Sequence, residues 1–180
     1  MMTYIALLRG INMGGHNKIA MAELRDFVSA LGFADVRTVL QSGNIVFRGR
    51  PRAPSSFEKL FETETAKRFG IDTRVMVRSA AEWEKIVAGN PFRDETKNDP
   101  AHLAVVFLKD KPVRKNLDSL KACITGREYF HALGRELYVV YPDGFATSKF
   151  TLSVIDRKLE TRGTARNWNT VLKLAGLTEV

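Results

Sequence analysis

The chain has 180 residues, of which 44% are hydrophobic and 27% charged, and its formal net charge is +8. This balance is typical of a globular protein that buries its own core. The single cysteine excludes an intrachain disulfide, and the apolar runs fall short of the roughly 20 residues that a membrane helix needs. We therefore expect a soluble, cytoplasmic protein without a membrane partner.

The first half of the chain predicts alternating strands and helices. An apolar run at residues 4–9 is typical of a central strand, and apolar residues at helical spacing follow over residues 21–31. Residues 36–41 and 44–48 predict a hairpin across a tight Ser-Gly turn. The loop between the first strand and the first helix, residues 10–18, is rich in glycine and asparagine.

A second helix over residues 56–69 and a strand over residues 73–78 complete a βαββαβ order, which is that of ferredoxin-like folds. The sequence Ser79-Ala-Ala-Glu82 is a capping box that predicts a short third helix. The polar stretch at residues 89–100 contains two prolines and is the best linker candidate.

The second half partly repeats this order but lacks an evident last strand. We predict a strand over residues 102–108, a helix over 112–122 and a hairpin of residues 127–132 and 136–141. Two helices follow, over residues 148–159 and 165–175. The expectation is an α+β protein of two ferredoxin-like lobes, the second incomplete and ending in helices. We expect residues 1–78 to form the first lobe, residues 79–100 a helix and polar linker, and residues 101–180 the second lobe.

The glycine-rich loop has the glycine spacing of a phosphate-binding Walker A loop, but His16 and Asn17 stand where lysine and Ser/Thr should be. The groups that would hold phosphate and magnesium are therefore missing, which argues against nucleotide hydrolysis. Backbone amides of such a loop can still hold an anion, or the glycines can serve only as positive-φ positions. The candidate ligand contacts here are Arg9, Asn12, Gly14, Gly15, Asn17 and Lys18.

Three more polar segments supply candidate ligand contacts. Ser42 and Asn44 flank the glycine of the hairpin turn, and Lys149 follows Ser148 after a later turn. Thr164 is predicted to cap the final helix, which places Arg166 and Asn167 in its first turn, beside unpaired backbone amides. Trp168 is predicted to lie on the buried face of that helix.

Catalytic and metal-binding patterns are weak. His102 and His131 lie in strand patterns without ligands at metal-binding spacing, so we expect neither a metal site nor another cofactor. Cys123 has no placed base and is interpreted as a packing residue. Residues 42–48 also share features with a strand motif of RNA-recognition domains, but Ile45 and Phe47 face one side together, most simply the core.

Long motifs give the chain a family resemblance. Residues 4–18, residues 41–47, Asn90-Pro-Phe92, Ser148-Lys149 and residues 164–170 resemble a bacterial family catalogued as domain of unknown function 1697. The resemblance implies two ferredoxin-like lobes and no established activity. It also implies a glycine where Glu160 stands and a lysine where His16 stands.

Three functional hypotheses follow. The first is a protein that binds a small anionic ligand where the first loop, the Ser42–Asn44 turn and the segment around Arg166 converge. The second is a nucleic-acid-associated module, because a net charge of +8 attracts polyanions. The alternative is that surplus Lys and Arg only solvate helix faces. The third is a small enzyme without a recognisable catalytic motif.

Overall fold

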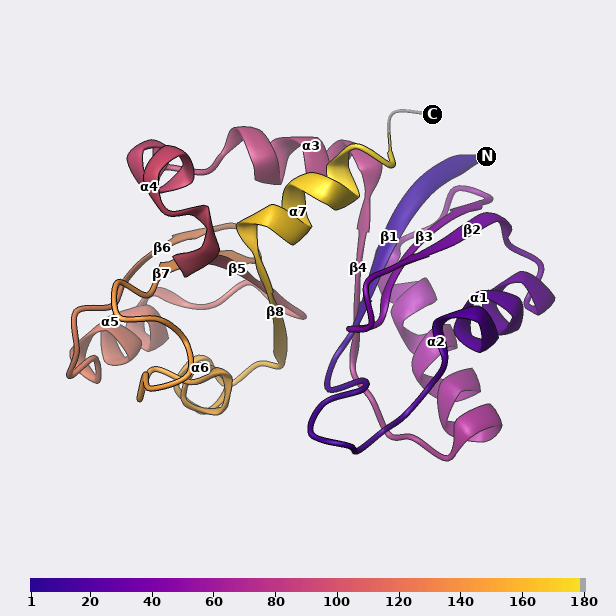
Figure 1. The fold of residues 1–180 in the computed structure, drawn as a ribbon, viewed down its shortest axis with the longest axis horizontal. Helices are drawn as coiled ribbons and strands as arrows, with labels where there is room; N and C mark the ends of the chain where they lie inside the picture. The colour runs from indigo at the N-terminus through magenta and orange to yellow at the C-terminus, as the bar shows by residue number, and fades with distance from the viewer. Residues whose placement is uncertain (179–180) are drawn as a thin grey trace. The chain divides into compact units, whose positions relative to one another are not determined.

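The computed structural model describes residues 1–178 and shows an α+β protein with two four-stranded antiparallel sheets (Figure 1). The chain divides into two compact units. The N-terminal unit comprises Met1–Lys85 together with the end of the chain from Leu174, and the C-terminal unit comprises Ile86–Lys173. None of the helices in the described part of the chain is long and apolar enough to cross a membrane.

The N-terminal unit has the predicted order of elements. They are β1 (Met2–Leu8), α1 (Met21–Ala30), β2 (Ala34–Val39), β3 (Asn44–Gly49), α2 (Pro54–Phe69) and β4 (Val75–Ser79). The strands lie in the order β2-β3-β1-β4. Both neighbours of β1 are antiparallel to it, so that Ile5 pairs with Val46 on one side and with Arg78 on the other.

The core of this unit lies between the sheet and its two helices. Side chains alternate across a strand, so every second residue of β1, beginning with Tyr4, faces a cluster that also contains Leu24 of α1 and Phe57 of α2. Aromatic rings dominate this cluster, and the ring of Tyr4 lies 4.6 Å from that of Phe57. The helix that presents Phe57 begins at Pro54 and ends at Phe69, and the next residue, Gly70, has a φ of 67°, which favours a residue without a Cβ.

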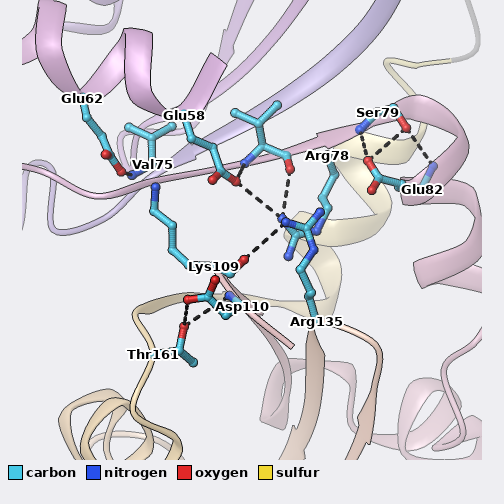
Figure 2. A network of polar contacts seen from close by, with 11 residues as sticks. Glu58, Glu62, Val75, Arg78, Ser79, Glu82, Lys109, Asp110, Arg135 and Thr161 are labelled. Atoms are coloured by element: carbon cyan, nitrogen blue, oxygen red, sulfur yellow. Dashed lines mark hydrogen bonds and ion pairs between the residues drawn. The ribbon is translucent and has the colours of Figure 1, made fainter. Parts of the chain in front are cut away.

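Carboxylates of α2 accept hydrogen bonds from the backbone of the edge strand β4. Glu58 Oε1 lies 2.9 Å from the amide nitrogen of Val77, and Glu62 Oε1 lies 2.9 Å from that of Val75. Figure 2 shows Glu58 and Glu62 directed at this strand. Glu58 also pairs with the buried guanidinium of Arg78 at 3.8 Å. Edge amides that would otherwise template another strand are thereby satisfied within the unit.

The remainder of the chain contains more regular structure than predicted. Its elements are α3 (Ala80–Ala88), α4 (Arg93–Asn98), the 3-10 turn η1 (Pro100–His102), β5 (Leu103–Leu108), α5 (Arg114–Ala122), β6 (Tyr129–Leu133), β7 (Glu136–Val140), α6 (Leu152–Leu159), β8 (Gly163–Asn167) and α7 (Trp168–Ala175). Serine 79 and Glu82 form the predicted capping box, with Glu82 Oε2 2.8 Å from the Ser79 amide. The stretch expected as a polar linker contains α4 and the first residue of η1.

The expectation that the second lobe lacks its last strand is wrong. β8 pairs with β5, and the sheet order β6-β7-β5-β8 repeats that of the first sheet. The prediction that Thr164 caps the final helix is wrong for the same reason, because Thr164 lies inside β8. The helix begins three residues later than expected, at Trp168, and Oδ1 of Asn167 accepts a 2.9 Å hydrogen bond from the Thr170 amide.

The two units share details beyond the order of their strands. Arg78 pairs with Ile5 in the first sheet, and Arg166 pairs with Val105 at the matching position of the second. The backbone bond from Leu108 N to Arg135 O, 2.9 Å, corresponds to the bond from Leu8 N to Gly43 O, also 2.9 Å. Such matched registers indicate that one structural plan is used twice in the chain.

Candidate functional site

The first loop is fastened to the N-terminal unit by the side chain of Asn12. Its Nδ2 donates to Ile19 O at 2.9 Å and to Gln41 O at 2.8 Å, while its Oδ1 accepts from the Ile19 amide at 2.9 Å. Both functional ends of the amide therefore hold the loop closed. The bond to Gln41 also ties the loop to the turn between β2 and β3, so two of the three segments predicted to converge do lie together.

The rest of the loop is shaped by left-handed backbone conformations. Asn12 and Asn17 have φ of 56° and 49°, and Gly14 and Gly15 have φ of 56° and 82°. Asn17 Nδ2 donates to Gly10 O at 3.1 Å. Gly14, Gly15, Asn17 and Lys18 are all exposed. Gly14 and Gly15 thus supply positive φ angles to the loop, as one of the two interpretations of the loop predicts. Asn17 helps to close the loop.

The Ser42–Asn44 turn is likewise held by its own polar groups. Asn44 is fully buried, and its Nδ2 donates to Val39 O at 2.8 Å and to Ser42 Oγ at 2.9 Å. Gly43 has a φ of 75°, and a Cβ there would come within 3.0 Å of Leu8 Cβ. Arg9, at the end of β1, accepts a 2.8 Å hydrogen bond from Thr73 Oγ1 through its carbonyl. These contacts give Asn44 and the backbone of Arg9 structural roles.

The remaining predicted residues belong to the C-terminal unit. Arg166 is buried in β8 instead of lying in the first turn of a helix, and its Nη1 donates to Thr164 Oγ1 and to Ala165 O, each at 2.8 Å. Burial lowers the pKa of its guanidinium to about 10, so it is still charged at neutral pH. Lys149 is exposed. The convergence of the segment around Arg166 with the first loop stays a prediction, and so does a ligand contact by Lys149.

A cavity in the C-terminal unit brings together residues that were not assigned to a site. Its volume is about 290 Å³, and it is lined by Val87, Ala88, Asn90, Arg93, Thr96, Lys97 and Trp168. The lining residues come from the end of α3, from the segment that contains α4, and from the first residue of α7. None of these seven residues is acidic, and two of them are cationic.

Trp168 is the most unusual member of this lining. Its side chain is 2% exposed, and its indole Nε1 has no hydrogen-bond acceptor among residues 1–178. A buried N–H without an acceptor costs about 1–3 kcal/mol, so native structures rarely leave one without a reason. Asn167 fixes the start of α7 by accepting from the Thr170 amide at 2.9 Å, which sets the position of the neighbouring Trp168.

Asn90 organises another part of the lining. Its Oδ1 accepts from the Phe92 amide at 3.0 Å, and its Nδ2 donates to Thr96 Oγ1 at 2.8 Å. Thr96 Oγ1 in turn donates to Phe92 O at 2.7 Å. These bonds form the first turn of α4, a helix whose own sequence is polar throughout. Arg93 and Lys97 are separated by four residues on α4 and therefore project from the same face.

A second anchor holds α4 to the sheet. Tyr129 of β6 donates a short hydrogen bond to the carboxylate of Glu95, and its ring packs against Phe92 with centroids 5.3 Å apart. The bond to Glu95, which favours the protonated phenol, raises the pKa of Tyr129 to about 12. α4 is thus held through Phe92, the residue before it, and through Glu95 in its middle. These contacts give Arg93 and Lys97 a defined place at the cavity.

Sequence reasoning missed Asn90, Arg93, Lys97 and Trp168 as members of a site. A signal existed for two of them, because Asn90-Pro-Phe92 and residues 164–170 are both among the motifs that carry the family resemblance. Arg93 and Lys97 look like any solvated charges on a polar stretch. Groups of three or more His, Cys, Asp or Glu side chains that could hold a metal ion are absent from the described residues.

Comparisons with known proteins place the chain beside uncharacterised relatives. A family model with the description "Protein of unknown function (DUF1697)" matches residues 1–138. A solved structure, described as that of a conserved bacterial protein from Streptococcus pneumoniae, is similar with a TM-score of 0.76 and 25% identity over 99% of each chain. No curated protein matches the chain.

Proposed function

The chain belongs to the DUF1697 family of proteins of unknown function, and we propose that this member binds a small anionic molecule in the cavity beside Trp168. The observation that carries the proposal is that Arg93 and Lys97 both line a cavity of about 290 Å³ that has no acidic residue in its lining.

The charges of the lining residues favour a negatively charged ligand. Arg93 and Lys97 project from one face of α4, and the lining has no acidic residue to neutralise them. A guanidinium and an ammonium side by side attract a carboxylate or phosphate, with hydrogen bonds to a charged partner that are about twice as strong as neutral ones. The net charge of +8 adds a long-range attraction for anions.

The cavity belongs to the C-terminal unit, and we propose a ferredoxin-like fold for each of the two units. The βαββαβ order and the strand orders β2-β3-β1-β4 and β6-β7-β5-β8 support this assignment. The helix α4 is an addition to that order of elements, and it supplies both cations of the cavity. We also propose a cytoplasmic location, in keeping with a single cysteine.

Binding can be tested with a panel of benzoate, inorganic phosphate and a nucleoside monophosphate, followed by thermal shift and tryptophan fluorescence. A ligand that binds the native state raises the melting temperature. We expect at least one anion to bind the native protein and the double variant R93Q/K97Q to lose about tenfold in affinity, the loss of roughly 1.4 kcal/mol of charged hydrogen bonding.

The matched control is the double variant R114Q/K121Q, which removes one arginine and one lysine from exposed positions on α5, away from the lining. It lowers the net charge by the same amount and should keep the native affinity. Equal losses in both double variants would show that the anion responds only to overall charge, and the proposed site would be wrong. Absence of binding by every anion in the panel would refute it as well.

A further inference from the structure

Two of the polar side chains that line the cavity are engaged with each other. Nδ2 of Asn90 donates to Oγ1 of Thr96 at 2.8 Å. Oδ1 of Asn90 accepts from the Phe92 amide at 3.0 Å, and Oγ1 of Thr96 donates to the Phe92 carbonyl at 2.7 Å. Both side chains therefore direct their hydrogen bonds at the segment that begins α4. The charged ends of Arg93 and Lys97 are the polar side-chain groups of the lining that are placed to bind a ligand.

The other lining residues are apolar. Val87 and Ala88 end α3, and Trp168 begins α7. The Nε1 donor of Trp168 is buried away from solvent, so it is not one of the atoms that a ligand in the cavity meets. The lining thus combines apolar side chains from two helices with two cations from a third.

The cations and the apolar side chains differ in exposure. Arg93 and Lys97 are exposed, and such residues keep their charged ends in water. Val87 is half-buried and Trp168 is 2% exposed. A charge is costly to bury without adequate partners, so the charge of a ligand belongs beside the two cations. The rest of the ligand then lies against apolar side chains, where a second polar group would lose water without gaining a partner.

The volume of the cavity, about 290 Å³, limits the size of the apolar part of the ligand. Ligand sites typically measure roughly 300–1,000 Å³, so this one suits a body of about one ring better than a nucleotide. Each CH2 group that is buried on binding raises the affinity about fourfold. An apolar body therefore adds affinity that an inorganic anion lacks.

We infer that the ligand is a small organic anion with one acidic group on a compact apolar body, about the size of a single six-membered ring. The inference rests on the proposed function and names the class of ligand for that same cavity. The acidic group binds Arg93 and Lys97, and the body packs against Val87, Ala88 and Trp168. A nucleotide or a sugar phosphate, which is polar throughout, does not match this lining.

The inference can be tested by isothermal titration calorimetry with matched carboxylates. Cyclohexanecarboxylate has an apolar ring, and oxane-4-carboxylate has the same ring with an ether oxygen in place of the CH2 group opposite the carboxylate. We expect cyclohexanecarboxylate to bind the native protein about tenfold more tightly, because the ether oxygen loses its hydration in the cavity. Acetate, which has the charge without the ring, should bind at least about tenfold more weakly than cyclohexanecarboxylate.

A variant of the apolar lining gives a second readout. V87T replaces one methyl group with a hydroxyl group and leaves the size of the side chain nearly unchanged. It should reduce the preference for cyclohexanecarboxylate about threefold, because the hydroxyl makes the lining less apolar and supplies a donor for the ether oxygen. The matched control V113T changes an exposed valine outside the lining and should keep the native preference. If V87T does not fold, the three carboxylates still decide the question on the native protein.

The outcomes separate the two proposals. Equal binding of the two ring carboxylates, weakened in R93Q/K97Q, would leave the anion site intact and overturn the inferred apolar body. Tighter binding of acetate, inorganic phosphate or a nucleoside monophosphate than of cyclohexanecarboxylate would overturn it too, as would an unchanged preference in folded V87T. Binding that R93Q/K97Q leaves unchanged, or failure of every anion to bind, would overturn both proposals.

Discussion

The Nδ2 atom of Asn90 donates a 2.8 Å hydrogen bond to Oγ1 of Thr96 and so joins the segment before α4 to the helix itself. The same side chain accepts from the Phe92 amide. Because α4 has only six residues, from Arg93 to Asn98, it is too short to be stable by its own backbone bonds. The place of the two cavity cations therefore depends on Asn90.

Replacing Asn90 with alanine should destabilise the protein and weaken anion binding together. The loss of two side-chain hydrogen bonds from a buried position predicts a decrease in the free energy of unfolding of about 1–3 kcal/mol. N98A, at the exposed end of the same helix, should change it by less than about 0.5 kcal/mol. Urea unfolding of both variants checks the prediction, and similar stabilities would show that Asn90 does not organise α4.

The hydrogen bonds of the first loop predict that replacing Asn12 destabilises the protein more than replacing Asn17. Asn12 and Asn17 both have positive φ, but the Asn12 side chain makes three hydrogen bonds of 2.8–2.9 Å and that of Asn17 makes one of 3.1 Å. We expect N12A to lower the free energy of unfolding by about 2–4 kcal/mol and N17A by about 1–2 kcal/mol. Because both variants put alanine at positive φ, the difference reports the hydrogen bonds, and an equal loss would contradict this account of the loop.

Glu160 occupies a position that favours glycine. It ends α6 with a φ of 54°, the left-handed region in which a Cβ is strained, and the family resemblance implies glycine there. Glycine should therefore stabilise the protein by about 1 kcal/mol, even though the exposed contact with Asn116 is lost. K158G, two residues earlier inside the helix, should destabilise it by about 1 kcal/mol. Thermal unfolding that showed both variants to be stabilised, or both to be destabilised, would contradict the prediction.

Tyr129 and Glu95 predict a stability that falls at high pH. The hydrogen bond raises the pKa of Tyr129 from its ordinary value of 10.0 to about 12 in the folded state. Between these values the folded state holds a proton that the unfolded state has lost, so stability decreases as the pH rises through this window. E95A should lower the pKa of Tyr129 towards 10, measured by phenolate absorbance with Y129F to identify the signal. An unchanged titration in E95A would show that the contact does not form.

Much of the fold could be predicted because hydrophobic periodicity reports the core. The strand of β1 and the helices that cover it follow from apolar spacing. β8 could not be found in this way, because its five residues Gly-Thr-Ala-Arg-Asn contain one apolar side chain, Ala165, and bury an arginine. Thr164 and Asn167 are both good N-cap residues, so only the pairing with β5 decides where the strand ends and α7 begins.

The site was less accessible to sequence reasoning. That Trp168 is buried was predicted and is confirmed by its 2% exposure, but an unpaired Nε1 depends on what surrounds the indole in three dimensions. The polar sequence of α4 has no helical periodicity, and its place is set by Asn90 and Tyr129. Sequence also cannot show whether Asn12 faces a ligand or its own backbone, and the hydrogen bonds of the loop resolve this in favour of the backbone.

Isothermal titration calorimetry of the tightest-binding anion in the panel tests most directly whether the cavity beside Trp168 binds an anion. Native protein and R114Q/K121Q should bind it with equal affinity, and R93Q/K97Q should bind it about tenfold more weakly. Affinity that is unchanged in R93Q/K97Q, while the anion still binds the native protein, would place the binding site elsewhere and contradict the proposed function.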